Sequence, residues 1–375
     1  GPDGVIVADP GVFAYVKEHV PNLDIHISTQ ANVCSSLTVR FWQSQGASLC
    51  VLGREVSFAE MVEIRQECPD IKLEAFIHGA MCMSYSGRCL LSNYLAERSA
   101  NQGNCAHSCR WNYSLKMRLK NGEDREITID ESNRDLFDFF LEEELRPGEL
   151  LEIAEDDHGA YILNSKDLCL MPKLSSFLEA GIDSLKIEGR NKSEYYVASV
   201  TRAYRAAIDS YYESPETWSP EPFMTELEKV QHRGYTLAFH EGHLTHHAHD
   251  YETTKSDSAW RTAGVVRAWE GDDLILEVRS TINKDDVIEF LSPLRFEPVR
   301  LKAAQLIDAD TGAVMPKASA GQGKAIRIPA GMFSGEDSVE ALLPVLSVAR
   351  IQAFDRDPSR GDRAEGKAFL ASDAP

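Results

Sequence analysis

The sequence predicts an α/β fold, a (β/α)8 barrel of the TIM type with an inserted cysteine-rich and hairpin segment, followed by a small C-terminal β-barrel domain. Short apolar runs recur about every 20 to 24 residues over the first 79 residues. Amphipathic stretches of about ten residues separate them, which is typical of βα units around a parallel sheet. Steady repetition of one unit favours a barrel over a doubly wound sheet.

The expected strands follow in chain order. Four are "DGVIVADPG" (3–11), "LDIHISTQ" (23–30), "ASLCVLGRE" (47–55) and "IKLEAFIHG" (71–79), and two more are "GAYILNSKD" (159–167) and "DSLKIEGR" (183–190). A long helix, "KSEYYVASVTRAYRAAIDSYY", follows the last strand. Six strands are two fewer than a barrel needs and residue 1 is Gly, so we expect two βα units to precede this sequence. A partial or open barrel is the alternative.

Other segments depart from this rhythm. Residues 80–158 carry paired cysteines and a hairpin pattern over 114–130 with "NGED" at its turn, and we expect an insertion on the barrel's C-terminal face. The barrel would then span 1–212. A linker and connecting segment (213–260) opens on the Pro-rich "ESPETWSPEPF", a small β-barrel domain (261–350) shows alternating strands, and 351–375 read as a flexible tail.

Composition limits the class of protein. The 375 residues carry a formal net charge of −20, which argues against nonspecific nucleic-acid binding over a large basic surface but leaves room for a local basic groove. No apolar run approaches the ~18 residues of a membrane span, and no secretory signal is recognisable. We therefore expect a cytoplasmic protein that does not bind membranes.

Eight cysteines suggest metal or redox chemistry. A disulfide framework is not expected in a long chain without an export signal. Thiolates bind zinc or iron–sulfur clusters, usually four at a time, so Cys82, Cys89, Cys105 and Cys169 are candidate ligands, with Cys109 as an alternate. The spacing matches neither zinc ribbons nor ferredoxins. The alternatives are buried structural thiols, which we expect for Cys34, Cys50 and Cys68, and a thiol nucleophile with His78 as its base.

Polar residues follow the predicted strands, at the edge where barrel enzymes bind substrates. They are Asp9, Ser28, Thr29, Gln30, Arg54, Glu55, His78, Asn164, Lys166, Lys186, Glu188 and Arg190. The alternation of Lys186, Glu188 and Arg190 places them on one strand face, where charges need partners or a ligand. An anionic ligand and a structural ion-pair network both fit. We expect the histidine-rich 240–250 to be a solvated surface loop, and no common hydrolytic or phosphate-loop motif is present.

Longer blocks carry a family resemblance. "EAFIHGAMCMSYSGRCLLS" (74–92) resembles the signature of the collagenase-like peptidase family of unassigned catalytic type, peptidase family U32. "NQGNCAHSCRWNY", "SLKIEGRNKSEYYVASVTRAYRAAID" and "STQANV" resemble further blocks of that family, so the resemblance extends from residue 1 to about 212. Some members are described as collagen-degrading proteases. Others hydroxylate the tRNA wobble uridine, a ribosomal RNA cytidine or quinone precursors without molecular oxygen.

The resemblance implies a cofactor and a reaction. Quinone-pathway members hold a [4Fe-4S] cluster on four cysteines, and Cys82, Cys89 and Cys105 match the family's cysteine block, with Cys169 as the fourth ligand. RNA hydroxylases of the family depend on prephenate, so the expected reaction is prephenate-dependent 5-hydroxylation of wobble uridine, with tRNA as partner. The chain does not indicate the electron donor or the oligomeric state. A peptidase, a hydroxylase acting on ribosomal RNA or quinone precursors, and a non-enzymatic scaffold remain alternatives.

The strand-end residues take specific roles in the expected reaction. Glu188 and His78 are acid–base candidates, and Lys186 and Arg190 would hold a carboxylate or phosphate. The residues expected to bind substrate or cofactor are Gln30, Asn32, Arg54, Glu74, Lys166, Lys192 and Tyr195.

Overall fold

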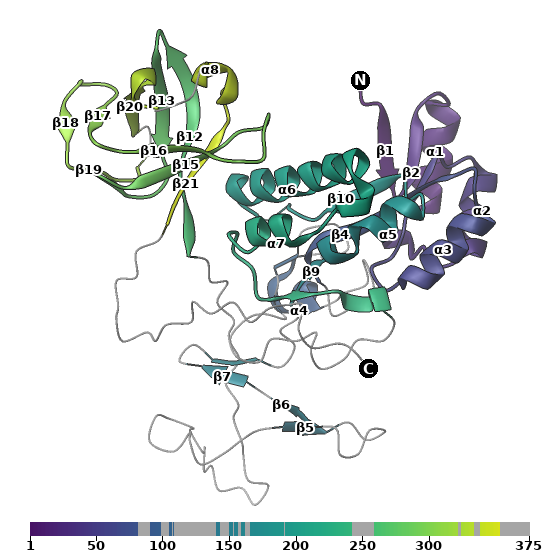
Figure 1. The fold of residues 1–375 in the computed structure, drawn as a ribbon. Helices are drawn as coiled ribbons and strands as arrows, with labels where there is room; N and C mark the ends of the chain where they lie inside the picture. Colours follow the sequence, from purple (N-terminus) through teal and green to yellow (C-terminus); the bar gives the residue numbers. More distant parts are fainter. Residues whose placement is uncertain are drawn as a thin grey trace, which may run out of the picture. The chain divides into compact units, whose positions relative to one another are not determined.

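The computed structural model describes residues 1–81, 91–98, 105–106, 108, 140–142, 150–152, 154–156, 159–161, 166–190, 192–241, 259–321, 324–333 and 338–352. Several predicted features lie outside these residues: Cys82, Cys89, Cys109, Asn164, the hairpin at 114–130, most of the histidine-rich stretch and nearly all of the predicted tail. The chain divides into two compact units, one of residues 1–188 with 233–256 and the other of 189–232 with 257–375 (Figure 1).

The first unit is built on an open, mostly parallel sheet. Its order is β1-β2-β3-β4-β9-β11, and β10 pairs with β4 off this path. The strands are β1 (Gly4–Val7), β2 (Asp24–Ile27), β3 (Leu49–Val51), β4 (Lys72–Ala80), β9 (Asp167–Cys169), β10 (Ser184–Ile187) and β11 (Tyr235–Thr236). The α-helices are α1 (Pro10–His19), α2 (Ser36–Gln45), α3 (Phe58–Glu67), α4 (Leu91–Ala96) and α5 (Leu174–Glu179). Short 3-10 turns are η1 (Thr29–Ala31), η5 (Met171–Lys173) and η7 (Ala238–Glu241).

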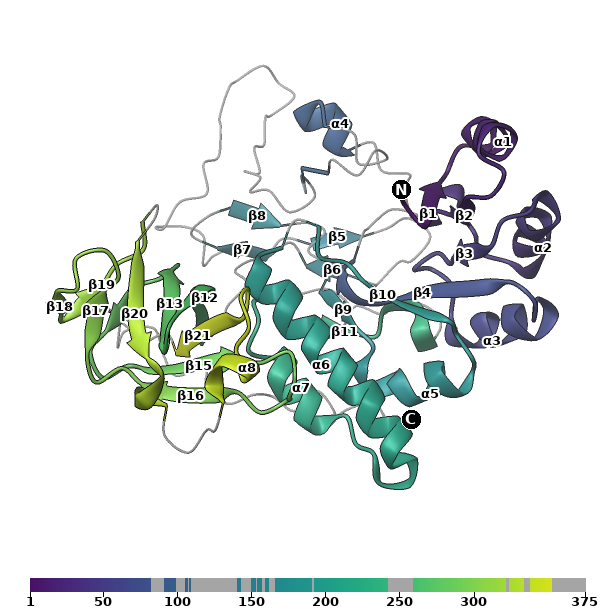
Figure 2. The ribbon, with the colours of Figure 1, turned by 90° about the horizontal axis from the view of Figure 1, so that it is seen from above.

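Local sequence signals explain the βα repeats at the start of this unit. The side chain of Asp9 accepts a hydrogen bond from the Val12 amide at the start of α1, and Ser57 with Glu60 forms a capping box at α3. Buried residues such as Ile27 alternate with more exposed ones along the strands. Figure 2 shows α1, α2 and α3 on one side of β1, β2 and β3. The predicted alternation of strands and helices is therefore present.

Strand β4 organises the sheet around it. Glu74 pairs with Val51 of β3 and with Ser184 of β10, so these parallel neighbours lie on opposite edges of β4. Farther along, His78 pairs with Cys169 of β9, which runs antiparallel. A closed eight-stranded parallel barrel is thus not found in the described part of the chain.

The predicted strand at 159–167 is wrong. Its first residues form β8 (Gly159–Tyr161), which pairs with β7 (Ala154–Asp156), and only its last residue belongs to β9 of the main sheet. Pairing between sequence neighbours costs little loop entropy, so the hairpin competes well with a long-range strand. A second small pair joins β5 (Phe140–Glu142) to β6 (Leu150–Glu152).

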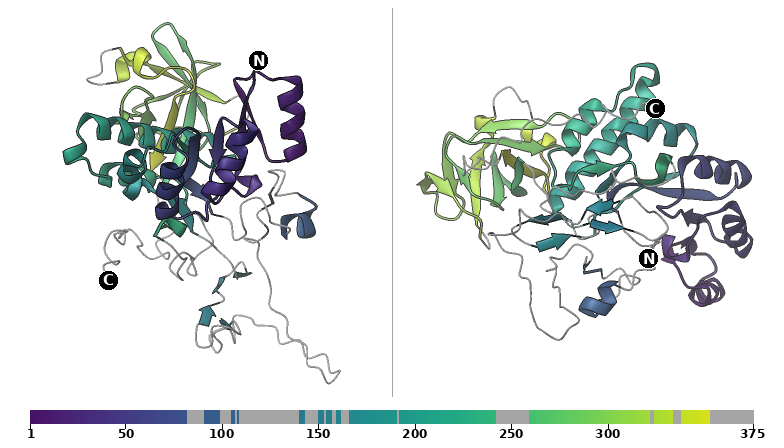
Figure 3. Two further views of the ribbon diagram at one scale, coloured as in Figure 1. Left: turned by 90° about the vertical axis from the view of Figure 1, so that its right-hand side faces the viewer. Right: turned by 90° about the horizontal axis from the view of Figure 1, so that it is seen from below.

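The second unit joins α-helices to an antiparallel sheet. The helices are α6 (Glu194–Glu213), α7 (Glu221–Leu227) and α8 (Val339–Leu342), with a 3-10 turn at η6 (Pro215–Thr217) and another at η9 (Ala330–Met332). The sheet order is β16-β15-β21-β12-β13-β20-β17-β18, and β14 pairs with β19. The strands are β12 (Trp260–Glu270), β13 (Asp273–Val278), β14 (Ile282–Asn283), β15 (Val287–Leu291), β16 (Val299–Lys302), β17 (Leu306–Asp308), β18 (Val314–Met315), β19 (Lys317–Ala318), β20 (Ala325–Pro329) and β21 (Val348–Gln352). Figure 3 shows this β-rich part in green to yellow.

The sheet of the second unit encloses an apolar core. Val266, Leu274, Phe290 and Ile351 are among its fully or almost fully buried residues. The strand order is an open path, so the described residues show an antiparallel sheet where the sequence predicted a closed small barrel.

The unit boundary differs from the one expected at residue 212. Helix α6 belongs to the β-rich unit, and α7 lies inside the predicted linker. The apolar residues of that linker explain this, because Trp218 donates a hydrogen bond to the Ala207 carbonyl at 3.0 Å and stacks on Phe223.

A buried ion cluster holds α7 to the sheet. Arg350 of β21 is fully buried and bonds Glu226 of α7 and Glu289 of β15, and Arg202 of α6 also bonds Glu226. Burial alone would raise the pKa of Glu226, but the hydrogen bonds and charge of Arg350 hold it below its ordinary value. Helices and sheet are therefore one packed unit.

Candidate functional site

Four charged side chains gather around Phe76 in the first unit, and we refer to them with Phe76 as the Phe76 cluster. Lys186 Nζ lies 2.7 Å from Glu74 Oε1, and Arg54 Nη2 lies 3.5 Å from Glu188 Oε2. The Arg54 guanidinium carbon lies 3.6 Å from the centroid of the Phe76 ring, and Lys186 Nζ lies 5.5 Å from it. Residues on or just after β3, β4 and β10 thus form one cluster.

Strand register explains why these residues meet. One face of β4 carries every second residue, Glu74, Phe76 and His78. The other face carries Leu73 and Ile77, which are buried. Lys186 pairs with Phe76 across the parallel β4–β10 ladder, so it follows the same face. Arg54 comes three residues after the end of β3, which pairs with the first half of β4.

Gly79 brings β10 close to β4. It has φ 123°, which L side chains rarely adopt, and an added Cβ would lie 2.6 Å from both the Cβ and the carbonyl oxygen of Glu188. The Glu188 amide also donates a hydrogen bond to the His78 carbonyl at 2.8 Å. The backbone position of Glu188 is therefore set by a glycine.

The Phe76 cluster balances its charges but stays partly open to water. Arg54 is 13% exposed and Glu188 is 35% exposed, whereas Ser184 Oγ donates to Glu74 at 2.6 Å and further encloses that carboxylate. The alternative of an ion-pair network among Lys186, Glu188 and Arg190 stays open, and the described ion pairs join Lys186 to Glu74 and Glu188 to Arg54. An anion could bind Lys186 or Arg54 by displacing a carboxylate, and Glu188 is the more accessible proton acceptor.

His78 and Cys169 lie at the far end of the same β4 face. They are register partners across β4 and β9, and both are buried. The His78 ring centroid is 5.5 Å from that of Tyr235 on β11. Asp167, which begins β9, pairs with Arg233. The sheet thus brings a histidine and a thiol together near the carboxyl end of β4. Cys82 follows the last residue of β4 by two positions in the sequence.

Other predicted binding residues occupy nearby strand ends in the first unit. Gln30 lies in η1, and Asn32 caps it in the left-handed conformation at φ 58°. Thr29 Oγ1 donates to the Leu52 carbonyl at 3.3 Å, which ties this turn to the end of β3. Lys166 extends its side-chain carbons to Gly234. A binding role for Gln30, Asn32 and Lys166 stays a prediction.

Three predicted residues fall in the second unit: Arg190, Lys192 and Tyr195. Arg190 is exposed, and Lys192 Nζ lies 4.8 Å from the Tyr196 ring. Tyr195 is buried and donates a hydrogen bond to the Lys229 carbonyl at 3.0 Å, and burial raises its pKa. These contacts tie Tyr195 to the interior of α6 and α7, while the binding roles of all three remain predictions.

Five cysteines that the structure describes form no disulfide: Cys34, Cys50, Cys68, Cys105 and Cys169. The structure confirms Cys50 and Cys68 as buried side chains, and burial, with the neighbouring Cys68, raises the pKa of Cys50 to about 12. Cys105 is partly exposed. Among the described residues no group of three or more His, Cys, Asp or Glu side chains could hold a metal, and three of the proposed ligands or alternates lie outside those residues.

His240 differs from the predicted solvated loop. It is buried, and its ring lies 4.9 Å from that of Phe58 and 5.4 Å from that of Phe177. Burial, with the positive charge of Lys173, lowers the pKa of His240 to about 4, so the ring is neutral at pH 7. It packs as an aromatic side chain.

Sequence reasoning missed Phe76 and Ser184. Both follow from alternation: Phe76 lies two residues after Glu74, and Ser184 two residues before Lys186, so each shares the face of a predicted charged residue. Aligning β4 with β10 through their charged residues would have identified Phe76 and Ser184 as neighbours of the site.

In the part of the chain that the structure describes, no helix has the length and apolar character to cross a membrane.

Comparisons with known proteins identify a family. The sequence model of Peptidase family U32 matches residues 1–250, which include the Phe76 cluster. The tRNA hydroxylation protein P of Escherichia coli is 38% identical over 316 residues, covering 78% of this chain and 68% of that protein. The protein of the same name from Haemophilus influenzae is 42% identical over 269 residues, covering 66% of this chain and 56% of its own length.

A third relative carries the name of an enzyme that modifies a different RNA. The 23S rRNA 5-hydroxycytidine synthase of Escherichia coli is 30% identical over 246 residues, covering 64% of this chain and 32% of that protein. The chain spans between 56% and 68% of the length of the two tRNA-related relatives.

Proposed function

The chain belongs to peptidase family U32, and from this membership we propose that it takes part in RNA hydroxylation, specifically the 5-hydroxylation of wobble uridine in tRNA. The observation that carries the proposal is its identity of 38% and 42% to two tRNA hydroxylation proteins. The Phe76 cluster supports it, because paired cations beside an accessible carboxylate suit an anionic co-substrate and a proton transfer.

The Phe76 cluster would bind the co-substrate. Prephenate carries two carboxylates, and Lys186 and Arg54 are two cations held near one aromatic ring. Each carboxylate would replace Glu74 or Glu188 as the partner of a cation. Glu188, once released from Arg54, would accept a proton, and His78 is the second acid–base candidate.

We propose that Cys82, Cys89 and Cys105 hold a [4Fe-4S] cluster, with Cys169 as fourth ligand and Cys109 as the alternate. Cys105 and Cys169 form no disulfide, and thiols are the ligand type that such clusters require. When bound, the cluster would supply one-electron transfer. The protein's own side chains would bind the anion, orient the uridine and move the proton.

The test uses the full-length protein in cells that lack their own copy. Nucleosides from their tRNA are measured by mass spectrometry, and we expect hydroxyuridine to be restored by the unaltered protein and lost with Glu188→Gln. The matched control is Glu67→Gln, which breaks an exposed ion pair with Arg40 elsewhere in the first unit. Normal hydroxyuridine with Glu188→Gln would remove Glu188 from the reaction, and no restoration by the unaltered protein would refute the proposed function.

Cluster ligation has a separate readout. Protein purified without oxygen should contain about four irons per chain and absorb near ~400 nm. Cys169→Ala should lower the iron content if Cys169 is the fourth ligand, whereas Cys109→Ala should do so if the alternate is correct. An iron-free protein that degrades gelatin would instead favour the peptidase alternative.

A further inference from the structure

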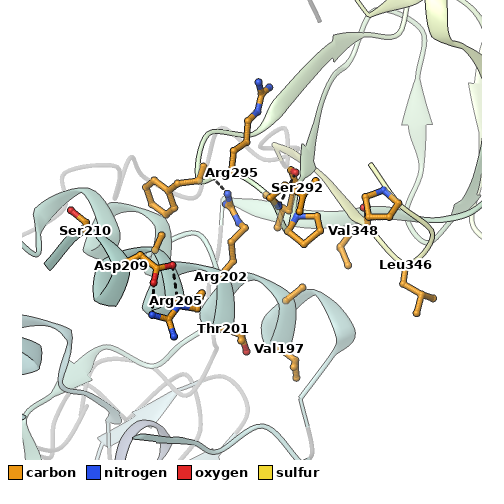
Figure 4. A pocket seen from close by; sticks show the side chains of 18 of the residues that line it. Val197, Thr201, Arg202, Arg205, Asp209, Ser210, Ser292, Arg295, Leu346 and Val348 are labelled. Atoms are coloured by element: carbon orange, nitrogen blue, oxygen red, sulfur yellow. Dashed lines mark hydrogen bonds and ion pairs between the residues drawn. The ribbon is translucent and has the colours of Figure 1, made fainter. Parts of the chain in front are cut away.

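The second unit contains a groove that shares no residue with the Phe76 cluster (Figure 4). It has a volume of about 760 Å³, within the range of ligand sites, and is lined by α6 from Val197 to Glu213 and by residues 291–296 and 344–348. Positions 197, 201, 205, 209 and 213 all line it and lie four residues apart, so the groove follows α6 for about 24 Å. Such a length suits an extended ligand.

Two buried polar side chains line this groove, and each has one atom without a hydrogen-bond partner among the described residues. Arg202 and Ser347 are more than nine-tenths buried, and Arg202 Nε and Ser347 Oγ have no partner among the described residues. The other Arg202 nitrogens bond the Phe296 carbonyl and Glu226. Figure 4 shows Arg202 reaching from α6 toward the loop that carries Ser292 and Arg295. Buried polar atoms are normally satisfied, so these two indicate a ligand or ordered water.

Apolar side chains are held exposed at the groove. Leu346 is 65% exposed and Leu294 is 68% exposed. Leu346 also has φ 76°, a backbone conformation that a residue with a side chain rarely adopts. Neither burial of its side chain nor backbone preference explains a leucine there, and such outliers concentrate at binding sites.

The charges and the aromatic ring indicate the class of ligand. Three arginines line the groove, Arg202, Arg205 and Arg295, in a chain whose net charge is −20. Arg202 is ion-paired with Glu226 and Arg205 with Asp209, so a phosphate at Arg205 would replace a carboxylate. The Arg202 guanidinium lies 5.2 Å from the centroid of the Phe296 ring, which also lines the groove. Apolar, aromatic and arginine surfaces together are what proteins use to bind unstacked bases and their phosphates.

We propose that this groove binds single-stranded nucleotides of the substrate tRNA, with bases against Phe296 and Leu346 and phosphates at Arg205 and Arg295. This inference rests on the proposed function, because it names the surface that would receive the RNA. It assigns that role to the second unit, apart from the Phe76 cluster.

The experiment measures the affinity of the full-length protein for a fluorescently labelled anticodon stem–loop RNA by anisotropy at several salt concentrations. We expect Arg205→Ala to weaken binding about three- to tenfold and to lower the salt slope by about one. The matched control is Arg267→Ala, which also removes an arginine that is ion-paired with a carboxylate in the second unit, outside the groove. It should leave affinity and slope unchanged.

Leu346→Gly provides a second, independent signature. Glycine accepts φ 76° without strain, so this variant should raise the melting temperature while it weakens RNA binding. A destabilised variant could not produce that combination by misfolding.

The outcomes separate this inference from the proposed function. RNA binding that Arg205→Ala and Leu346→Gly leave unchanged would overturn the groove assignment alone. If the two variants bind UMP more weakly but RNA as tightly as before, the groove is a site for free nucleotides and the groove assignment is overturned. If they lose binding to a protein partner while their RNA affinity is unchanged, the assignment is overturned as well. An unaltered protein that binds no tRNA would overturn both.

Discussion

Gly79→Ala should damage the Phe76 cluster through the backbone. The new Cβ would lie 2.6 Å from the Cβ and carbonyl oxygen of Glu188, whereas ordinary contacts begin near 3.4 Å. Strands β4 and β10 must therefore separate by roughly 0.8 Å, since the obstructing carbonyl is backbone and cannot rotate away. We expect the free energy of unfolding to fall by about 1–3 kcal/mol because of the unfavourable φ of 123°, and by about 1–3 kcal/mol more because of overpacking.

Gly181→Ala is the matched control in the same unit. Gly181 also has positive φ, 71°, but an added Cβ would meet only the Arg65 Cδ, at 4.0 Å. The Gly181→Ala variant should lose about 1–2 kcal/mol of unfolding free energy, from backbone strain alone. Hydrogen exchange of β4 and β10 peptides in increasing urea would measure both variants, because a local probe does not require the two units to unfold together.

Activity should diverge more than stability does. A displacement near 1 Å of a reacting group can reduce a rate about 100-fold, so Gly79→Ala should lose most tRNA hydroxyuridine while Gly181→Ala retains it. Equal stability losses and equal activity in the two variants would refute the reasoning, because the close approach of Glu188 to Gly79 would then have no consequence.

Three further expectations concern named ion pairs and thiols. Lys186→Met leaves Glu74 without its cation, and it should lower stability by about 1 kcal/mol and abolish tRNA hydroxyuridine in the cellular assay. Arg350→Met should destabilise the second unit by about 3–5 kcal/mol in urea melts. Because Arg350 holds the pKa of Glu226 below its ordinary value, Glu226 stabilises the fold at neutral pH and this contribution is lost as the pH falls below about 4.5; the variant should lack that acid sensitivity. Cys50, with a pKa of about 12, should resist iodoacetamide in the folded protein when alkylation is followed by mass spectrometry.

Controls for these three experiments come from the same chain. Arg40→Met breaks an exposed pair in the first unit and should leave hydroxyuridine unchanged. Arg267→Met should preserve the acid sensitivity of the second unit, and Cys34, which is partly exposed, should be alkylated first. The opposite result in any pair would show that the site, the buried cluster or the burial of Cys50 has been misassigned.

The first βα units could be predicted because their signals are local. Alternating apolar residues and the caps at Asp9 and Ser57 place β1 to β4 and their helices within a few residues of the expected bounds. The antiparallel β9 and the membership of α6 in the β-rich unit could not be predicted. Both depend on pairing between residues far apart in the sequence, which spacing does not encode.

The candidate site shows the same division. The positions of Arg54, Lys186 and Glu188 near strand ends were predictable from the sequence, but their partners were not. Whether Lys186 meets Glu188 or Glu74 depends on the register of β10 against β4, and a shift of one residue would turn the side chain to the other face.

The buried cluster of Arg350 has a consequence for synthesis on the ribosome. Glu226 and Arg350 are 124 residues apart, so helices α6 and α7 emerge long before the arginine that completes their core. At about 5–20 residues per second, the delay is roughly 6–25 s, during which the apolar face of α6 has no sheet to cover it. Val200, Ala203 and Tyr204 on that face would be exposed to chaperones while the first unit has already begun to form its strands. Completion of the second unit is thus timed by translation of its last strand.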